Sequence, residues 1–458
     1  MEAAAAAAAA AKKRRFGRST GKGSLVTAST TSAASPTPSS VRSSPSSPTQ
    51  DAARTQAVSR RWRPLWRSTP LNLDVDSLST QERKRTMFVS RILASHPGPA
   101  RRLSLPFFRL RDRYAQLDGW LRSAALADLQ ELDFSYDIED KEALYPLPPS
   151  ALRFAPTLRV VKLRTCHFPN GMAPTLHFPR LARLTLYRVT ISEDTLHGLL
   201  SRCSALESLL LVGNFGIRRL RINSPSLRSL GFSASSWEGH RDANFQEVVI
   251  EDAPCLERLM PLYPNHGPAT IRVIAAPKLE VLGVLSDGIS QLHLGTTIFQ
   301  KMIAVNLTTS IRTVKVLVLD SDGPNLDAVV DFLSCFPCLE RLYIAVIKDT
   351  RRYDPLNPIE CIEFHLKKVV IRNYGGRRPD VDFAKFFVLN AKALREMELA
   401  GLNNCNQKWL ANQHRRLQLE KKASQNAQFT FKTTHTSDFS MNKHTHDLSI
   451  SDPFDRSL

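Results

Sequence analysis

Cysteine and histidine are the side chains that would first be expected to do chemistry in this chain, and their spacing does not build a site. Cys335-Phe-Pro-Cys338 is the single C-x-x-C pair, whereas a zinc site needs a second pair of ligands at suitable spacing. Three further histidines, His435, His444 and His446, lie in a polar C-terminal stretch. The sequence has no nucleotide-binding glycine loop, H-E-x-x-H or G-x-S-x-G motif. We therefore expect no enzyme, no metal site and no cofactor.

Basic side chains at equivalent places indicate binding chemistry instead. Arg183, Arg258, Arg341 and Lys368 each stand directly before the apolar part of a repeated segment. Guanidinium and ammonium groups pair with carboxylates and phosphates, so these residues predict a basic stripe for an acidic or phosphorylated partner. The alternative is that they serve solubility alone. The predicted target-binding residues are Arg183, Leu210, Arg258, Arg341, Tyr343 and Lys368.

The elements that position these side chains repeat the frame L-x-x-L-x-L. Its first apolar position falls at Leu129, Leu158, Leu181, Leu206, Leu227, Leu256, Leu279, Val314, Leu339, Leu366 and Leu394. The spacings run from 21 to 29 residues, with one of 35 that marks an insertion around Gly288–Ser310. This resembles the leucine-rich repeat, whose units are about 20–29 residues long and must stack to bury their apolar side. We predict an α/β fold, an irregular leucine-rich-repeat solenoid (horseshoe).

Alternation within the frame predicts a strand whose leucines point inward and whose intervening residues point outward. Leu209 and Leu317 are predicted inward, while Arg258 is predicted outward, where its replacement would hardly change stability. Asn214 occupies the place from which an amide bonds the backbone of the repeat turn. The alternative is a set of unrelated amphipathic strands.

Composition limits the class of partner. The formal charge is +19, but residues 1–70 alone hold twelve Lys/Arg and two acidic residues. We expect no nucleic-acid partner, because no binding motif or aromatic-rich basic face accompanies the charge. No apolar run approaches the roughly 20 residues of a membrane span.

Seven scattered cysteines without a secretory signal predict reduced thiols. The N-terminus fits disorder, nuclear import or organelle transit, so we expect the nucleus or cytoplasm, with an organelle left open.

Residues 51–74, DAARTQAVSRRWRPLWRSTPLNLD, place apolar side chains at helical spacing up to Pro70. The stretch resembles the second half of a plant F-box, the helical module that docks on a Skp-type adaptor. The resemblance implies adaptor-binding roles for Val58, Trp62, Leu65 and Trp66. The acidic, leucine-rich first half is not found before Asp51, which implies weaker docking. The alternative is that both tryptophans cap the first repeat.

Residues Cys361–Leu399 predict a strand, a Gly375-Gly376 turn, a helix and a second strand. Together with Leu417–Phe431 they resemble the FBD domain that ends many plant F-box/leucine-rich-repeat proteins. The predicted organisation is a disordered low-complexity segment 1–50, a partial F-box 51–75, a helical connector 76–99 with a helix over Thr80–His96, leucine-rich repeats 100–350, an FBD-like domain 358–432 and a polar tail 433–458.

The resemblance implies a substrate-recognition subunit of an SCF-type ubiquitin ligase. Its partners would be a Skp-type adaptor, a cullin and a target protein bound by the repeats. The alternative is an interaction scaffold that has lost adaptor docking and works outside any ligase.

Overall fold

The structure is a computed structural model. It describes residues 69–79, 81–96, 99–108, 113–137, 145–234, 245–263, 267–306, 310–320, 326–345, 359–401, 406–433 and 444–455. The predicted low-complexity segment and the four predicted adaptor-binding residues lie outside these ranges.

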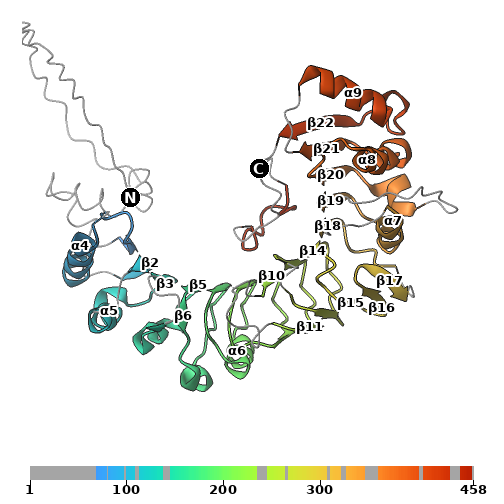
Figure 1. Ribbon diagram of the computed structural model, residues 1–458. Coiled ribbons are helices and arrows are strands. Elements are labelled where there is room, and N and C mark those ends of the chain that lie inside the picture. Colours follow the sequence, from blue (N-terminus) through green and yellow to red (C-terminus); the bar gives the residue numbers. More distant parts are fainter. Residues whose placement is uncertain are drawn as a thin grey trace, which may run out of the picture. The chain divides into compact units, whose positions relative to one another are not determined.

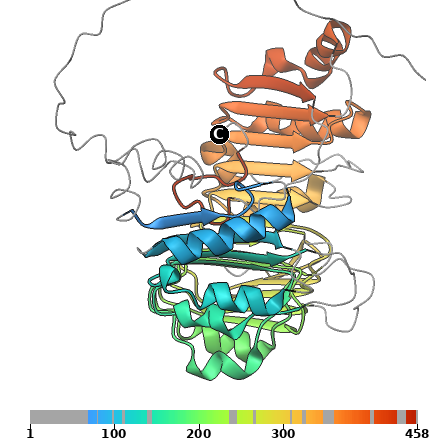
Figure 2. The same cartoon turned by 90° about the vertical axis from the view of Figure 1, so that its left-hand side faces the viewer.

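One 14-stranded parallel sheet dominates the described part, and its strands follow one another in chain order. Figure 2 shows these strands stacked one upon the next. The strands are β1 (Leu71–Asp74), β2 (Ala100–Phe108), β3 (Glu131–Tyr136), β5 (Val160–Arg164), β7 (Arg183–Tyr187), β8 (Ser208–Val212), β10 (Ser229–Ser233), β12 (Arg258–Pro261), β14 (Val281–Leu285), β18 (Val316–Asp320), β19 (Arg341–Ala345), β20 (Lys368–Arg372), β21 (Glu396–Gly401) and β22 (Gln428–Thr433). The fold is therefore mixed α/β with many strands.

The repeat frame sets the register of this sheet. Leu184 pairs with Leu209, Leu209 with Leu230, and Leu230 with Leu259. The same row continues through Leu317 and Leu342 to Met397. The frame that starts at Leu279 predicts that Leu282 and Val284 both point inward, and for Val284 this prediction is wrong. The register shifts after Leu282, so Leu285 lies in the larger hydrophobic core while Val284 packs on the opposite face of the sheet.

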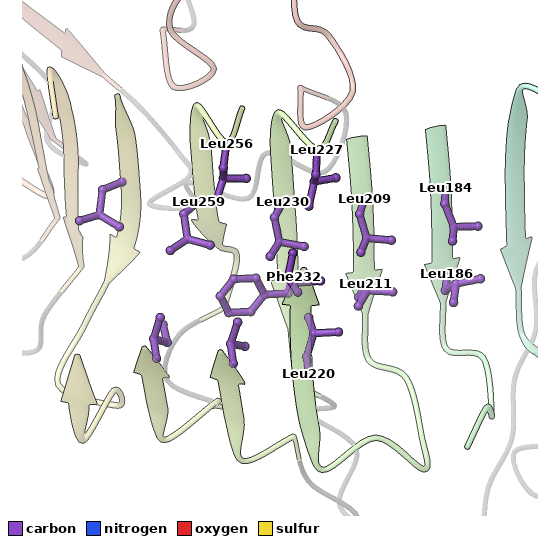
Figure 3. Close-up of a cluster of buried hydrophobic side chains, with 14 of the residues drawn as sticks. Leu184, Leu186, Leu209, Leu211, Leu220, Leu227, Leu230, Phe232, Leu256 and Leu259 are labelled. Carbon is purple, nitrogen blue, oxygen red and sulfur yellow. The ribbon is translucent and has the colours of Figure 1, made fainter. Parts of the chain in front are cut away.

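The main core is a row of leucines that continues from strand to strand (Figure 3). Leu209 and Leu317 are both fully buried, as predicted. Between the strands, Asn214 accepts a hydrogen bond from the Val189 amide at 2.9 Å and donates one to the Leu186 carbonyl at 3.0 Å. The predicted role of Asn214 in the repeat turn is thus confirmed.

Helices lie along the core side of the large sheet (Figure 1). They are α4 (Glu82–Ser95), α5 (Tyr114–Leu121), α6 (Glu193–Leu200), α7 (Leu326–Ser334) and α8 (Arg378–Asn390), with α9 (Gln407–Leu417) near the C-terminal end of the sheet. Helix α4 occupies the predicted connector and buries Val89 and Leu93. Met87 on the same helix is 47% exposed.

Short helical turns complete these connections. They are η1 (Ala124–Leu126), η2 (Pro149–Phe154), η3 (Asn170–Thr175), η6 (Cys361–His365) and η7 (Leu419–Lys421). Side-chain oxygens at the N-caps satisfy free amides where helices begin: Ser192 accepts from Thr195 N at α6, and Asn406 from Trp409 N at α9.

A second sheet forms where the sequence predicts only connections and an insertion. Its six strands are ordered β17-β16-β15-β13-β11-β9. Their bounds are β9 (Arg219–Asn223), β11 (Glu247–Asp252), β13 (Thr270–Val273), β15 (Gln291–Leu294), β16 (Thr297–Gln300) and β17 (Ile303–Asn306). The insertion around Gly288–Ser310 thus adds an antiparallel hairpin to this sheet. The short strands β4 (Tyr145–Pro146) and β6 (Cys166–His167) pair separately.

The predicted FBD-like segment has its expected strand, helix and strand, but it does not begin a separate sheet. Strand β20 pairs with β19 of the preceding repeat, so the large sheet runs on through it. Gly376 has φ +68° in the predicted turn before α8. Strands β20 and β21 therefore continue the sheet surface formed by the repeats.

Candidate functional site

The face of the large sheet turned away from the main core, called here the second face, carries the predicted target-binding residues. Strand register places Arg183, Ser208, Ser229 and Arg258 in one row, which continues through Val281 and Val316 to Arg341 and Lys368. A neighbouring row contains Leu210, Gly231 and Met260 and, further on, Val318 and Tyr343. The basic residues do share one row, but hydroxyl and apolar side chains interrupt it.

The C-terminal residues His444–Asp455, called here the tail segment, lie across the second face (Figure 1, dark red). Their contacts begin at β7 and β8 and proceed in strand order to β20. A stretch that the sequence presents as a polar tail is therefore packed against residues up to 261 positions away.

His446 fixes the first part of the tail segment. Its Nδ1 lies 2.7 Å from Ser208 Oγ and its Nε2 lies 2.7 Å from Thr185 Oγ1. Ser208 Oγ also donates to the Thr445 carbonyl at 3.0 Å, so it accepts from Nδ1–H while Thr185 donates to Nε2. Burial, followed by the positive charges of Lys162 and Arg183, lowers the pKa of His446 to about 4. The docked imidazole is thus neutral at neutral pH.

Acidification should weaken docking of the tail segment through His446. A released imidazole has a pKa near 6.5 and takes up a proton below it, while the docked one stays neutral until about pH 4. Docking is therefore unaffected above pH 6.5 and weakens by about tenfold for each pH unit between 6.5 and 4. Protease accessibility of the tail segment across this pH range measures the effect. His446→Gln, which cannot titrate, should remove this dependence, and an unchanged slope in that variant would contradict the assignment.

Arg258 holds the backbone of the tail segment. Its Nη1 donates to the Asp447 carbonyl at 2.8 Å, and its Nη2 donates to the Ile450 carbonyl. The side chain is 3% exposed, and burial lowers its pKa. The prediction that Arg258 faces solvent is therefore wrong, because the tail segment covers it.

Asp452 and Asp455 bring carboxylates to the far part of the row. Asp452 Oδ2 accepts from Tyr343 Oη at 2.7 Å and lies 3.5 Å from Arg341 Nη1. Asp455 Oδ2 lies 3.1 Å from Lys368 Nζ. Burial acts to lower the pKa of Lys368, but hydrogen bonds to Asp455 and Glu396 outweigh it and raise that pKa overall.

Between these two carboxylates, Phe454 enters an apolar cluster. It is 1% exposed, and its ring centroid lies 6.0 Å from that of Tyr343. The other buried members come from strands β8 to β20 and their ends: Leu210, Val212, Met260, Leu262, Val281, Val284, Val316, Val318, Tyr343, Ala345 and Val370. Complete burial of one Phe side chain contributes about 1.5–3 kcal/mol, so Phe454 is the main apolar anchor of the tail segment.

An open groove of about 920 Å³ continues from the tail segment over the N-terminal strands. Arg102, Lys162, Arg164 and Arg183 supply positive charge there, and acidic side chains including Asp133 lie between them. Arg164 pairs with Asp133 at 2.8 Å. Arg183 remains exposed. The tail segment thus contacts the second face from β7 to β20, while the open groove lies over the strands from β2 to β8.

The predicted target-binding set therefore divides in two. Arg183 faces the open groove, while Arg258, Arg341, Tyr343 and Lys368 contact the tail segment and Leu210 packs in its apolar cluster. The predicted target-binding set does not include Ser208, Thr185 or the tail residues themselves. The one available signal was the Asp452-Pro-Phe-Asp455 sequence, an acidic and aromatic motif in a basic chain.

None of the helices in the described ranges is long and apolar enough to cross a membrane. Within the same ranges, no group of three or more His, Cys, Asp or Glu residues could hold a metal ion.

Comparison with known proteins identifies two regions of similarity. Residues 117–344 match the LRR repeats of FBD-associated F-box protein At5g56370, and residues 354–399 match the FBD domain. The first match covers repeats whose strands belong to both sheets, and the second includes β20 and most of β21 of the large sheet.

Individual relatives carry the same combination in their names. FBD-associated F-box protein At1g66310 of Arabidopsis thaliana is 27% identical over 69% of this chain and 65% of its own length. F-box/FBD/LRR-repeat protein At5g56420 of the same plant is 25% identical over 76% of this chain and 86% of its own length. F-box/LRR-repeat protein At4g14103 is 30% identical over 46% of this chain and 55% of its own length. The chain thus spans less than two thirds of some of these relatives.

Proposed function

Because the chain belongs to the plant F-box/FBD/leucine-rich-repeat proteins, we propose that it is a substrate-recognition subunit of an SCF-type ubiquitin ligase. In this role it binds a target protein through its repeats and positions it, while other subunits carry out ubiquitin transfer. A Skp-type adaptor and a cullin are the partners that this role requires.

The observation that carries the proposal is the second face itself. Successive strands place arginine, lysine, tyrosine and hydroxyl side chains in two rows across a broad surface, and part of that surface is already occupied by a peptide segment. Stacked repeats form extended surfaces of the kind used to bind proteins. We also infer that the repeats form a solenoid, which is supported by the parallel pairing of fourteen strands in chain order.

Adaptor docking tests the ligase role directly. The full chain should co-purify with a Skp-type adaptor and a cullin, and Trp62→Ala combined with Trp66→Ala should abolish this association. Buried tryptophans at interfaces contribute at least about 2 kcal/mol each, which corresponds to a loss of several hundredfold or more for the pair. Glu207→Ala, an exposed change immediately before β8, is the control that should leave association unchanged. Absence of the adaptor from the wild-type complex would instead indicate an interaction scaffold outside any ligase.

A further inference from the structure

We propose that the second face recognises a short acidic segment in which an aromatic residue lies between two carboxylates, and that Asp452–Asp455 is the chain's own copy of such a ligand. The partner is a protein that carries this segment in an extended, accessible stretch. Its identity as a target for ubiquitin transfer rests on the proposed function, whereas the binding chemistry does not.

Side-chain recognition of the motif involves three residues, Asp452, Phe454 and Asp455. Tyr343 and Arg341 bind the Asp452 carboxylate, the apolar cluster takes the Phe454 ring, and Lys368 binds Asp455. Asp452 is 2% exposed, and a carboxylate so buried requires a paired and hydrogen-bonded environment. Asp452 also accepts from the Phe454 amide at 3.0 Å, which fixes the turn that brings ring and carboxylates together.

Before this motif the second face binds the tail segment mainly through its backbone, with the His446 side chain as the sequence-dependent exception. Arg258 binds the carbonyls of Asp447 and Ile450, and Ser208 binds that of Thr445. At Gly231 the tail approaches so closely that a Cβ would lie 2.8 Å from Thr445 Oγ1. The second face therefore combines a track for any peptide backbone with a specific end site for acidic and aromatic side chains.

Charge favours an acidic occupant. The tail segment contains Asp447, Asp452 and Asp455 and no Lys or Arg, and it lies against Arg258, Arg341 and Lys368. The open groove beside His446 continues the surface with Arg102, Lys162 and Arg183, so a longer acidic partner has room beyond the motif. Such a partner must first displace the tail segment, because the two occupy the same residues.

The tail segment thus acts as an internal competitor. A covalently attached ligand has an effective concentration on the order of millimolar when its connection can span the distance. A free peptide of equal chemistry should consequently bind the intact chain much more weakly than a chain that lacks the tail segment.

A labelled peptide with the sequence of residues 444–455 tests the proposal without adaptor or cullin. Fluorescence anisotropy is measured with the full chain and with a chain that ends at Thr433, each verified as folded by thermal melting. We expect saturable binding to the shortened chain and at least about tenfold weaker binding to the full chain, as internal competition requires. Equal affinity of the two chains, or no binding by the folded shortened chain, would overturn the proposal.

Variants locate the bound peptide. Phe454→Ala in the peptide, or Asp452→Asn with Asp455→Asn, should weaken binding at least tenfold. Gly231→Ala in the shortened chain should also weaken binding, because the new Cβ meets Thr445. Gly198→Ala on α6, where a Cβ meets nothing within 4 Å, is the matched control. Peptide variants that bind as tightly as the parent sequence would contradict recognition of the motif.

A second variant covers the case in which the shortened chain does not fold. The full chain with Phe454→Ala and Asp455→Asn keeps its length but loses its anchor, so it should bind the labelled parent peptide more tightly than the wild-type chain does. Unchanged affinity in this variant would overturn the proposal. Since no ligase subunit is present, peptide binding can succeed even if adaptor docking fails, and the two outcomes are separable.

Discussion

Leu209→Ala should lower the free energy of unfolding by about 2–5 kcal/mol, the range observed when a buried leucine is truncated and leaves a cavity. Leu209 is fully buried in the main core, where it lies in register with Leu184 and Leu230. Parallel strands on both sides prevent local collapse around the missing side chain, which favours the upper part of that range. Chemical denaturation of the purified chain measures the change.

Glu207→Ala is the matched control for this prediction. Glu207 lies two residues earlier, immediately before the same strand, and is exposed. Exposed substitutions usually remain within about 0.5 kcal/mol. Similar losses in the two variants would show that the frame does not separate core from surface positions.

The repeat frame predicts so much of this fold because one physical requirement is applied at every copy. Each strand must bury its leucines against the next, so the spacing of Leu181, Leu206 and Leu227 determines both the strands and their register. The helix over Glu82–Ser95 and the FBD strand, helix and strand also follow from local periodicity. The second sheet does not follow, since strands such as Thr270–Val273 are four residues long and gain their order from neighbouring copies.

The tail segment that covers the predicted site residues could not be foreseen from the sequence, for a different reason. Alternation along a strand predicts which side chains point away from the main core, but it does not predict which other residues contact them. Tyr343 and Arg258 do leave the core, yet they are 1% and 3% exposed because the tail segment covers them. That contact joins residues more than 100 positions apart, and no periodic pattern relates them. The strands of the second face and the tail segment are related only by complementary chemistry. Acidic side chains pair with basic ones, and Phe454 packs in an apolar cluster.

Arg258→Ala should release the tail segment while leaving the repeats folded. The substitution removes hydrogen bonds from a charged donor to two carbonyls, and each such bond contributes about 1.5–3 kcal/mol. Once the tail segment is released, the two carbonyl groups form hydrogen bonds with water, which offsets part of the lost binding energy. The net loss in docking free energy is therefore roughly 2–4 kcal/mol, which weakens docking about 30- to 1,000-fold. Hydrogen exchange of the amides within residues 444–455 should accelerate by a similar factor.

Arg258→Lys separates charge from geometry in the same experiment. A lysine keeps the positive charge but lacks the planar fork with which arginine reaches two acceptors at once, so it should restore only part of the protection. The melting temperature of the repeats should change little in either variant, because Leu259 beside it faces the main core and is untouched. Unaltered exchange in Arg258→Ala would show that the carbonyl contacts do not hold the tail segment. A lower melting temperature without faster exchange would show that Arg258 stabilises the sheet itself. The proposed binding of a peptide backbone by Arg258 would then be wrong.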